Sequence, residues 1–443
     1  MSFPHLTWGC LRQAAGVSAI GLAMVASPLR AQNDAHILYK LQPGDTLSRL
    51  VVRMGLPPQA LQDIVRDNNL QDPNLIFAGD DLRIPRYPVR SVPSTATVSR
   101  INCSSIVRLD GGRTVPVQAG DKLQEGHVVQ IPAGCQMAVT LEDHSQLRML
   151  SGAVVKFRTL RRQSHEAVPQ VSLELLDGRT EVSVPRKRLN GDAAFEIRTP
   201  ISVAGVRGTE FRMGFDARKR KSQIEVTDGE VVTKGEGEAQ EQTARAGQAV
   251  VTEADGKSLP IEDMLAAPRY AGGSSGPGRG DWVFHFEAPD KAREFLVRLA
   301  EDASFSFFQS SRSIPQPQLQ VDGLGSRTSF QQWAAVSASG IVGFSNNYAF
   351  CRAYLRQDAW RCNVNFKMFG IENPHLRLLR MEPSGQQTAI VDRDLKLGAQ
   401  DQLVLRGLPS GRYKWQIEHD LEEGRRTTQN GEFELVTIPA DIS

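Results

Sequence analysis

The sequence predicts a mainly β, multidomain protein. Most of the chain after residue 100 alternates apolar and polar residues with a period of two, and turn signals rich in Gly and Asp separate these segments. Apolar residues at helical spacing occur in a short stretch, residues 47–68. A chain of 443 residues is too long for a single hydrophobic core, so three or four domains are expected.

The composition is typical of soluble globular protein, with 40% apolar and 23% charged residues. The formal net charge of +2 does not indicate any particular class of binding partner. Methionine and aromatic residues are scattered, so neither a coiled coil nor a membrane bundle is indicated. No segment after residue 31 has about eighteen uninterrupted apolar residues, and we expect the mature protein to be soluble.

Residues 1–31 have the features of an export signal peptide. Arg12 precedes an apolar run from Ala14 to Ala26, and Ala31 offers a cleavage point. The run is too short to span a bilayer comfortably. We therefore expect the protein to be exported to a bacterial periplasm.

The cysteines agree with an oxidising compartment. Removal of Cys10 with the signal leaves Cys103, Cys135, Cys351 and Cys362. Four cysteines permit three connectivities, and sequence separation favours Cys103 with Cys135 and Cys351 with Cys362. The alternative is a set of buried thiols. No CxxC spacing occurs, so neither redox catalysis nor a zinc site is supported.

Residues 36–86 predict a small domain with the order strand, helix, helix, strand. Residues 38–41 alternate like a strand, and Pro43-Gly44 turns the chain before Asp45 or Thr46, which can cap a helix. Helical spacing then predicts one helix over residues 47–54 and a second after Pro57-Pro58. A closing strand is expected at residues 82–85.

These residues resemble a LysM domain over their whole length. The family's opening and closing motifs and its central asparagine are matched by Tyr39, Leu41, Gly44, Asp45, Thr46, Leu47, Asn68, Ile76, Gly79, Leu82, Ile84 and Pro85. The resemblance implies binding of glycans that contain N-acetylglucosamine, here peptidoglycan. Two loops would form the groove, with the ligand-binding residues Gly44, Asp45, Thr46, Leu47, Pro73, Asn74, Leu75, Ile76 and Phe77.

Loop residues of this kind suit a sugar, because backbone amides can bond its acetamido group while apolar side chains pack on its methyl group and face. The alternative is that they only build the turns. The sequence departs from the family where the usual Gly-Gln is Gly79-Asp80. The added carboxylate would weaken contact with an anionic peptide stem.

Residues 87–99 are rich in Pro, Ser and Thr and predict an extended linker. Residues 100–257 then predict a second domain of many short strands, either a β-sandwich or a β-solenoid. Near its centre, residues 199–211 form an apolar run interrupted by Gly205 and Gly208. Glycines in a strand pattern suggest a bulge or a close backbone approach.

This TPxxVAxVRGTEF pattern resembles the signature of the FecR family, with Arg207, Gly208, Thr209 and Phe211 in the family's order. The resemblance implies an all-β periplasmic domain that acts in envelope signalling and protein contacts. The alternative for Arg207 is a structural arginine that caps carbonyl groups where strands cross.

Basic clusters at residues 161–162, 186–188 and 218–221 fall between predicted strands and are expected to be solvated hairpin tips. They lack interleaved aromatic residues, so no nucleic acid is expected as a partner. An anionic polymer of the envelope is the alternative.

Residues 258–280 predict a second linker. Its Gly-x-Ser-x-Gly lacks the strand and helix that a nucleophile elbow needs. Two β-sandwich modules are expected next, over residues 281–350 and 351–443. Residues 330–350 and 412–433 follow one plan: a strand with a central tryptophan, a glycine-containing turn and a strand that ends in phenylalanine. Residues 408–413 resemble the strand entry of fibronectin type III and immunoglobulin-like modules.

No catalytic residues, metal ligands or cofactor are expected, because the histidines lack ligand spacing and no nucleotide-binding motif occurs. The sequence therefore predicts a non-enzymatic peptidoglycan-binding protein whose β domains serve protein interaction or envelope signalling. The expected partners are peptidoglycan and an envelope or membrane signalling protein. The alternatives are a wall-anchored structural scaffold and an accessory of a cell-wall hydrolase.

Overall fold

The computed structural model describes residues 36–54, 56–85, 91–163, 169–185, 195–206, 208–278, 280–324, 328–352, 354–356, 359–367, 374–395, 402–420 and 426–438. The chain divides into two compact units, Met1–Pro88 and Val89–Ser443, which are described separately. The predicted signal peptide, the basic cluster at 186–188 and Arg207 lie outside the described residues. Within those residues, every helix is too short or too polar to cross a membrane.

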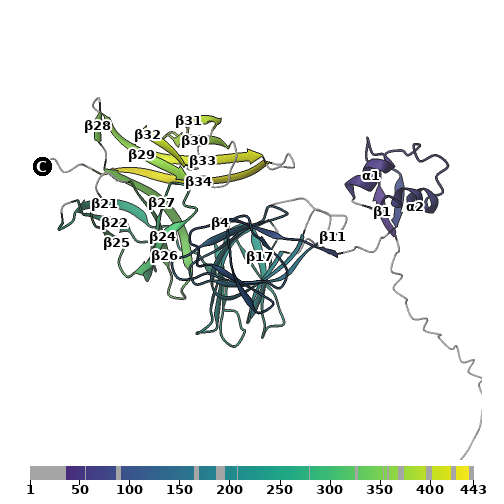
Figure 1. Ribbon diagram of the computed structural model, residues 1–443, viewed down its shortest axis with the longest axis horizontal. Helices are drawn as coiled ribbons and strands as arrows, with labels where there is room; N and C mark the ends of the chain where they lie inside the picture. Colours follow the sequence, from purple (N-terminus) through teal and green to yellow (C-terminus); the bar gives the residue numbers. More distant parts are fainter. Residues whose placement is uncertain are drawn as a thin grey trace, which may run out of the picture. The chain divides into compact units, whose positions relative to one another are not determined.

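The first unit has the predicted order of strand, helix, helix, strand (Figure 1). Its elements are β1 (His36–Lys40), α1 (Leu47–Arg53), α2 (Ala60–Asp67) and β2 (Asp81–Pro85). The two strands pair antiparallel, and the helices bury their apolar side chains against them. The core consists of Leu41, Leu47, Leu50, Val51, Ala60, Ile64, Leu82 and Ile84.

Asn68 joins the end of α2 to β2. Its side-chain Nδ2 donates to the carbonyls of Ile64 (2.8 Å) and Arg83 (2.6 Å), and its Oδ1 accepts from the Arg83 N–H (2.7 Å). The side-chain amide thus pairs with β2 as a neighbouring backbone would. The loop between α2 and β2 is therefore anchored at both ends. Asn68 anchors its first end to β2, and its second end continues directly into β2.

The second unit begins with two sheets that share the long strand β12 (Pro169–Ser183) and face a common core. The first sheet also contains β3 (Ser91–Pro93), β5 (Val107–Asp110), β6 (Arg113–Pro116), β8 (Val128–Gln130), β11 (Val154–Gln163), β13 (Phe195–Thr199), β14 (Ser202–Val206), β17 (Glu230–Gly235) and β18 (Gln242–Arg245). The second sheet also contains β4 (Ala96–Ile101), β7 (Lys122–Leu123), β9 (Met137–Leu141), β10 (Gln146–Met149), β15 (Glu210–Asp216), β16 (Lys221–Asp228), β19 (Gln248–Thr252) and β20 (Glu262–Asp263).

The period-two pattern explains this packing. In β13, for example, Phe195, Ile197 and Thr199 are buried and alternate with half-buried charged residues. Apart from the parallel pair β12–β13, the described pairings of these sheets are antiparallel. Both sheets contribute to one hydrophobic core, as expected for a mainly β domain.

Both predicted linkers contain strands. Residues 91–93 pair with the end of β11, and residues 96–101 pair with β9. β21 (Arg269–Ser275) pairs with β22 (Trp282–Glu287), although its sequence is rich in glycine and serine. Pairing with the next strand along the chain outweighs the weak local propensity of these residues. The Gly-x-Ser-x-Gly segment therefore overlaps a strand end.

The rest of the second unit is built on an eight-stranded sheet. In spatial order its strands are β24 (Phe308–Ile314), β23 (Glu294–Ala300), β26 (Thr328–Val336), β27 (Val342–Arg352), β34 (Arg426–Ile438), β33 (Gly411–Asp420), β30 (His375–Met381) and β31 (Gln387–Asp394). One three-stranded sheet contains β21, β22 and β25 (Gln318–Val321), and another contains β28 (Tyr354–Arg356), β29 (Ala359–Lys367) and β32 (Gln402–Leu408).

The two segments predicted to be related are neighbours in this sheet. The hairpin β26–β27 and the hairpin β33–β34 join through a parallel pairing of β27 with β34, for example Phe350 with Val436. The predicted boundary at 350/351 falls inside β27, so the two segments share one sheet, and each of the two core clusters contains residues from both segments. Trp282, Trp333 and Trp415 are all buried in those cores.

A pH-dependent cluster lies at the edge of the eight-stranded sheet. His375 contacts Asp394 through Nδ1 (2.8 Å) and Asp392 through Nε2 (2.7 Å). The hydrogen bonds to Asp394 and Asp392 raise the pKa of His375 above its usual 6.5. The bond to His375 lowers the pKa of Asp392 below its usual 3.8.

We expect this hairpin to be most stable between pH 3.8 and 6.5. The stability that His375 contributes is fully present below its unfolded pKa and is lost as pH rises through its higher folded pKa. The stability that Asp392 contributes is fully present above its unfolded pKa and is lost as pH falls through its lower folded pKa. The protection factors of β31 amides, which are corrected for the intrinsic rise of exchange rates with pH, should therefore fall above neutral pH. His375→Gln should remove this dependence; an unchanged profile in that variant would contradict the prediction.

Candidate functional site

The first of the two loops predicted to bind glycan connects β1 to α1, and its side chains are largely occupied in building the turn. Gly44 has a φ of +86°, a conformation that favours glycine. Asp45 Oδ2 accepts hydrogen bonds from the Gln42 N–H (2.8 Å) and the Tyr39 hydroxyl (2.9 Å). Thr46 Oγ1 accepts from the Arg49 N–H (3.2 Å) and so caps α1. Leu47 is a core residue, 2% exposed.

In the second loop, between α2 and β2, Asp72 stabilises a turn. Its Oδ1 accepts from the Asn74 N–H (2.9 Å) and from Asn74 Nδ2 (3.1 Å). Ile76 packs against the core, whereas its neighbours Leu75 and Phe77 are 62% and 65% exposed. Exposed apolar side chains on both sides of a buried one form a surface suited to the face of a sugar ring.

Backbone pairing brings the two loops together. The Leu41 N–H donates to the Asp80 carbonyl (2.9 Å), and the Gly79 N–H donates to the Leu41 carbonyl (2.8 Å). Leu41 leads into the first loop, and Gly79-Asp80 follows the second. The exposed members of the predicted set are Gly44, Thr46, Pro73, Asn74, Leu75 and Phe77, while Leu47 offers only its backbone.

The FecR-like signature forms a strand crossing. Gly208 has a φ of +61°, and a Cβ on Gly229 would lie 2.8 Å from the Gly208 carbonyl oxygen. Thr209 Oγ1 donates to the Glu230 carbonyl (2.7 Å) and accepts from its N–H (3.3 Å). A register shift follows at Glu210/Phe211, and Phe211 is buried in the core. The close backbone approach suggested by the glycines therefore occurs at Gly208, while Gly205 lies in regular β14.

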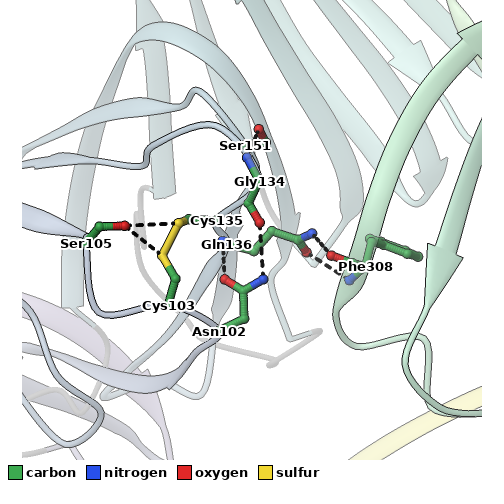
Figure 2. Close-up of a disulfide and its surroundings, with 8 residues drawn as sticks. All are labelled: Asn102, Cys103, Ser105, Gly134, Cys135, Gln136, Ser151 and Phe308. Carbon is green, nitrogen blue, oxygen red and sulfur yellow. Dashed lines mark hydrogen bonds between the residues drawn. A yellow bond between two sulfur atoms is a disulfide. The ribbon is translucent and has the colours of Figure 1, made fainter.

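Both disulfides favoured by sequence separation are present, Cys103–Cys135 and Cys351–Cys362. The first lies beside a contact with the C-terminal strands (Figure 2). Asn102 Oδ1 accepts from the Gln136 N–H (2.6 Å), and Gln136 Nε2 donates to the Phe308 carbonyl (2.8 Å). The disulfide thus braces the loop that presents Gln136 to β24.

A buried ionic cluster, which the sequence analysis missed, joins the two halves of the second unit. Glu225, 0% exposed, lies 2.6 Å from Arg179 Nη2 and 3.5 Å from Arg212 Nε. Its Oε1 accepts from the Val342 N–H (3.2 Å), and Arg212 Nη2 donates to the Val342 carbonyl (2.7 Å).

Glu181 continues this cluster, with Arg148 Nη1 at 3.0 Å and Arg298 Nη1 at 2.7 Å. Burial alone would raise the pKa of Glu181, but the charges of Arg148 and Arg298 outweigh it and lower the pKa to about 2. Glu181 therefore stays ionised, and its charge is balanced from both halves of the unit.

The basic clusters are partly neutralised. Arg161 forms a two-pronged contact with Glu125 (2.8 and 3.0 Å), and Arg162 lies 3.8 Å from Glu142. Lys219 lies 3.8 Å from Asp216, and Lys221 lies 3.4 Å from Glu253. This pairing fits solvated strand ends better than a surface for a polyanion.

Comparison with known proteins supports two of the assignments. The model described as LysM domain matches residues 39–85, and that described as FecR protein matches residues 127–232. No curated protein sequence matches this chain.

Among solved structures, a candidate anti-sigma factor from Parabacteroides distasonis is similar at 16% identity and a TM-score of 0.26, covering 31% of this chain and 59% of its own. The extracellular domain of a candidate one-component system from B. thetaiotaomicron has 10% identity and a TM-score of 0.14, over 82% of this chain and 61% of its own. A tandem-repeat region of a large adhesion protein has 10% identity and a TM-score of 0.14, over 78% of this chain and 93% of its own. Scores this low carry no argument about function. The family matches show a LysM domain and, after it, a FecR domain within the residues that they cover.

Proposed function

We propose that the protein is a non-enzymatic periplasmic protein that binds peptidoglycan through its LysM domain and contacts an envelope signalling protein through the FecR-like and C-terminal β domains. The observation that carries the first half is the exposure of Leu75 and Phe77 on a loop of the matched LysM domain. Such side chains cost solvation free energy unless a ligand covers them.

The second half rests on the FecR match and on the β architecture that follows it. We also assign the C-terminal strands to fibronectin- or immunoglobulin-like modules. Support comes from Tyr413, whose hydroxyl donates to the Pro409 carbonyl (2.6 Å), four residues upstream, as in the tyrosine corner of such modules. Burial raises the pKa of Tyr413 to about 12, so the hydroxyl keeps its proton.

Deletion of residues 36–90 tests the division of roles. The deletion ends just before β3 and removes the first compact unit, so the second unit should stay folded. The shortened protein should no longer co-sediment with purified peptidoglycan. Equal sedimentation of both proteins would refute wall binding by the LysM domain. Clearing of a cell-wall suspension by the intact protein would instead refute the non-enzymatic role.

Phe77→Ala should weaken peptidoglycan binding roughly five- to thirtyfold, as expected for about 1 to 2 kcal/mol of lost apolar contact. Because Phe77 is 65% exposed, the domain should keep its fold. Leu38→Ala is the matched control, since Leu38 is 71% exposed on β1, outside both loops. Titration with N-acetylglucosamine pentamer measures both variants, and equal losses would argue against the groove.

Signalling and scaffolding can be separated in cells. The second candidate function is a wall-anchored structural scaffold. If the protein is a scaffold, its function in the cell should require both units in one chain. A signalling protein should retain activity when the second unit alone is exported, and failure of that variant in a signalling assay would favour the scaffold.

A further inference from the structure

The two disulfides of the second unit differ in how well solvent reaches them. Cys351 and Cys362 are 2% and 1% exposed and belong to a hydrophobic core. Cys135 is 6% exposed, but its partner Cys103 is partly exposed and lies near the exposed Ser105. A thiolate must reach a sulfur atom in order to cleave a disulfide, so a reductant should attack Cys103–Cys135 first.

Ser105 is placed to assist this cleavage (Figure 2). Its Oγ lies 3.3 Å from Cys103 Sγ and 3.4 Å from Cys135 Sγ. The sulfur atoms of a disulfide carry no proton, so the hydroxyl group is the donor in either contact. When a thiolate attacks Cys103 Sγ, Cys135 Sγ leaves as a thiolate. A hydrogen bond from Ser105 stabilises this anion and makes Cys135 a better leaving group.

The disulfide adjoins a contact that covers the start of an edge strand. β24 lies at the edge of the eight-stranded sheet, and Phe308 is its first residue. The Phe308 N–H donates to Gln136 Oε1 (3.4 Å), and Gln136 Nε2 donates to the Phe308 carbonyl (2.8 Å). Gln136 is 5% exposed, so its carboxamide takes the place of a neighbouring strand here and shields both backbone groups from water.

The position of Gln136 depends on the two segments that the disulfide joins. Asn102 directly precedes Cys103, and Gln136 directly follows Cys135. Asn102 Oδ1 accepts from the Gln136 N–H (2.6 Å), and Asn102 Nδ2 donates to the Gly134 carbonyl (3.4 Å). Asn102 is exposed, so water competes for these hydrogen bonds once the covalent link no longer holds the two segments together.

We propose that Cys103–Cys135 is a redox-sensitive switch, whose reduction by a dithiol releases Gln136 from Phe308 and opens the start of β24 while the rest of the unit stays folded. The dithiol supplies two electrons and two protons. It becomes a disulfide itself, and Cys103 and Cys135 become thiols.

Other contacts hold the two halves of the unit together after reduction. Arg212 Nη2 donates to the Val342 carbonyl (2.7 Å), and Arg298 Nη1 lies 2.7 Å from Glu181. These residues belong to strands outside the segments that the disulfide joins. The change is therefore confined to the neighbourhood of Phe308.

Treatment of the full chain with dithiothreitol, without denaturant, tests the chemical step. Alkylation followed by peptide mapping should find free thiols at Cys103 and Cys135 while Cys351–Cys362 stays oxidised. The buried disulfide is thus the matched control. Resistance of Cys103–Cys135 to the dithiol, or reduction of both disulfides at the same rate, would overturn the proposal.

Hydrogen exchange of the same samples tests the structural step. The protection factor of the Phe308 amide should fall about two- to tenfold on reduction, the factor that corresponds to one hydrogen bond. That of the Val342 amide, which donates to Glu225, should stay the same. Unchanged protection at Phe308 would refute the release, and an equal fall at Val342 would mean that reduction unfolds the whole unit.

Two variants keep the disulfide and test its neighbours. Gln136→Met keeps the length of the side chain but removes its amide, so Phe308 should lose protection already in the oxidised protein. Reduction should then have no further effect on Phe308, and a further fall would show that the disulfide acts by another route. Ser105→Ala should slow reduction by dithiothreitol about two- to tenfold without changing protection at Phe308; an unchanged rate would contradict the role of the hydroxyl group.

Discussion

Glu225→Gln should destabilise the second unit by about 3 to 5 kcal/mol, the range found when one partner of a buried ion pair is removed. Glu225 is fully buried between Arg179 and Arg212. Without its charge, two guanidinium groups would remain near each other with poor solvation. The N–H of Val342, from β27, would also lose a carboxylate acceptor.

Urea unfolding of the deletion protein that lacks residues 36–90 measures this effect without interference from the first unit. Glu125→Gln is the matched control, because Glu125 also forms a two-pronged contact with an arginine but is 36% exposed at its side chain. An exposed pair of this kind contributes about 0 to 1 kcal/mol. If both variants lose the same stability, the cluster around Glu225 is not desolvated as we describe.

The site of damage can also be located. Hydrogen exchange at the Val342 N–H should accelerate in Glu225→Gln, because that N–H donates to the Glu225 carboxylate. Exchange at the Cys351–Cys362 end of β27 should change less. Uniform acceleration along β27 would mean that global unfolding dominates and that the contact between the halves is not selectively weakened.

Local patterns were sufficient to predict the first unit. Its turn, helix cap and helical spacing all act within a few residues. The loops at residues 44–47 and 73–77 were located by the same signals. Which of their side chains are free could not be predicted, because the occupation of Asp45 by Tyr39 and the burial of Leu47 depend on packing.

In the second unit, local sequence patterns were not sufficient to predict the contacts between its two halves. Period-two alternation predicts many of its strands, but it assumes that the polar face of each strand meets water. Arg212 and Glu225 occupy that face and instead contact Val342 of the C-terminal half. The strand β3 was missed because its pairing partner, the end of β11, lies far along the chain. The strand β21 was missed because its glycine- and serine-rich sequence has a weak strand propensity.

Ile64→Ala should unfold the LysM domain and abolish peptidoglycan binding while leaving the second unit intact. Ile64 is 0% exposed and lies on α2, in a core built from few residues. Truncation of a buried isoleucine costs about 2 to 5 kcal/mol, because apolar contacts are lost and a cavity remains. A domain of this size has only a few kcal/mol of stability to lose.

Scanning calorimetry of the full chain should show the transition of the small domain disappear while the larger one stays in place, since the two units are separate. Gln62→Ala, an exposed change on the same helix, should keep both transitions and full binding. Together with Phe77→Ala, these variants separate two causes of lost binding: Phe77→Ala removes contact from a folded domain, whereas Ile64→Ala removes the fold that holds the loops together. Retained binding by an unfolded Ile64→Ala domain would mean that the wall is recognised elsewhere in the chain.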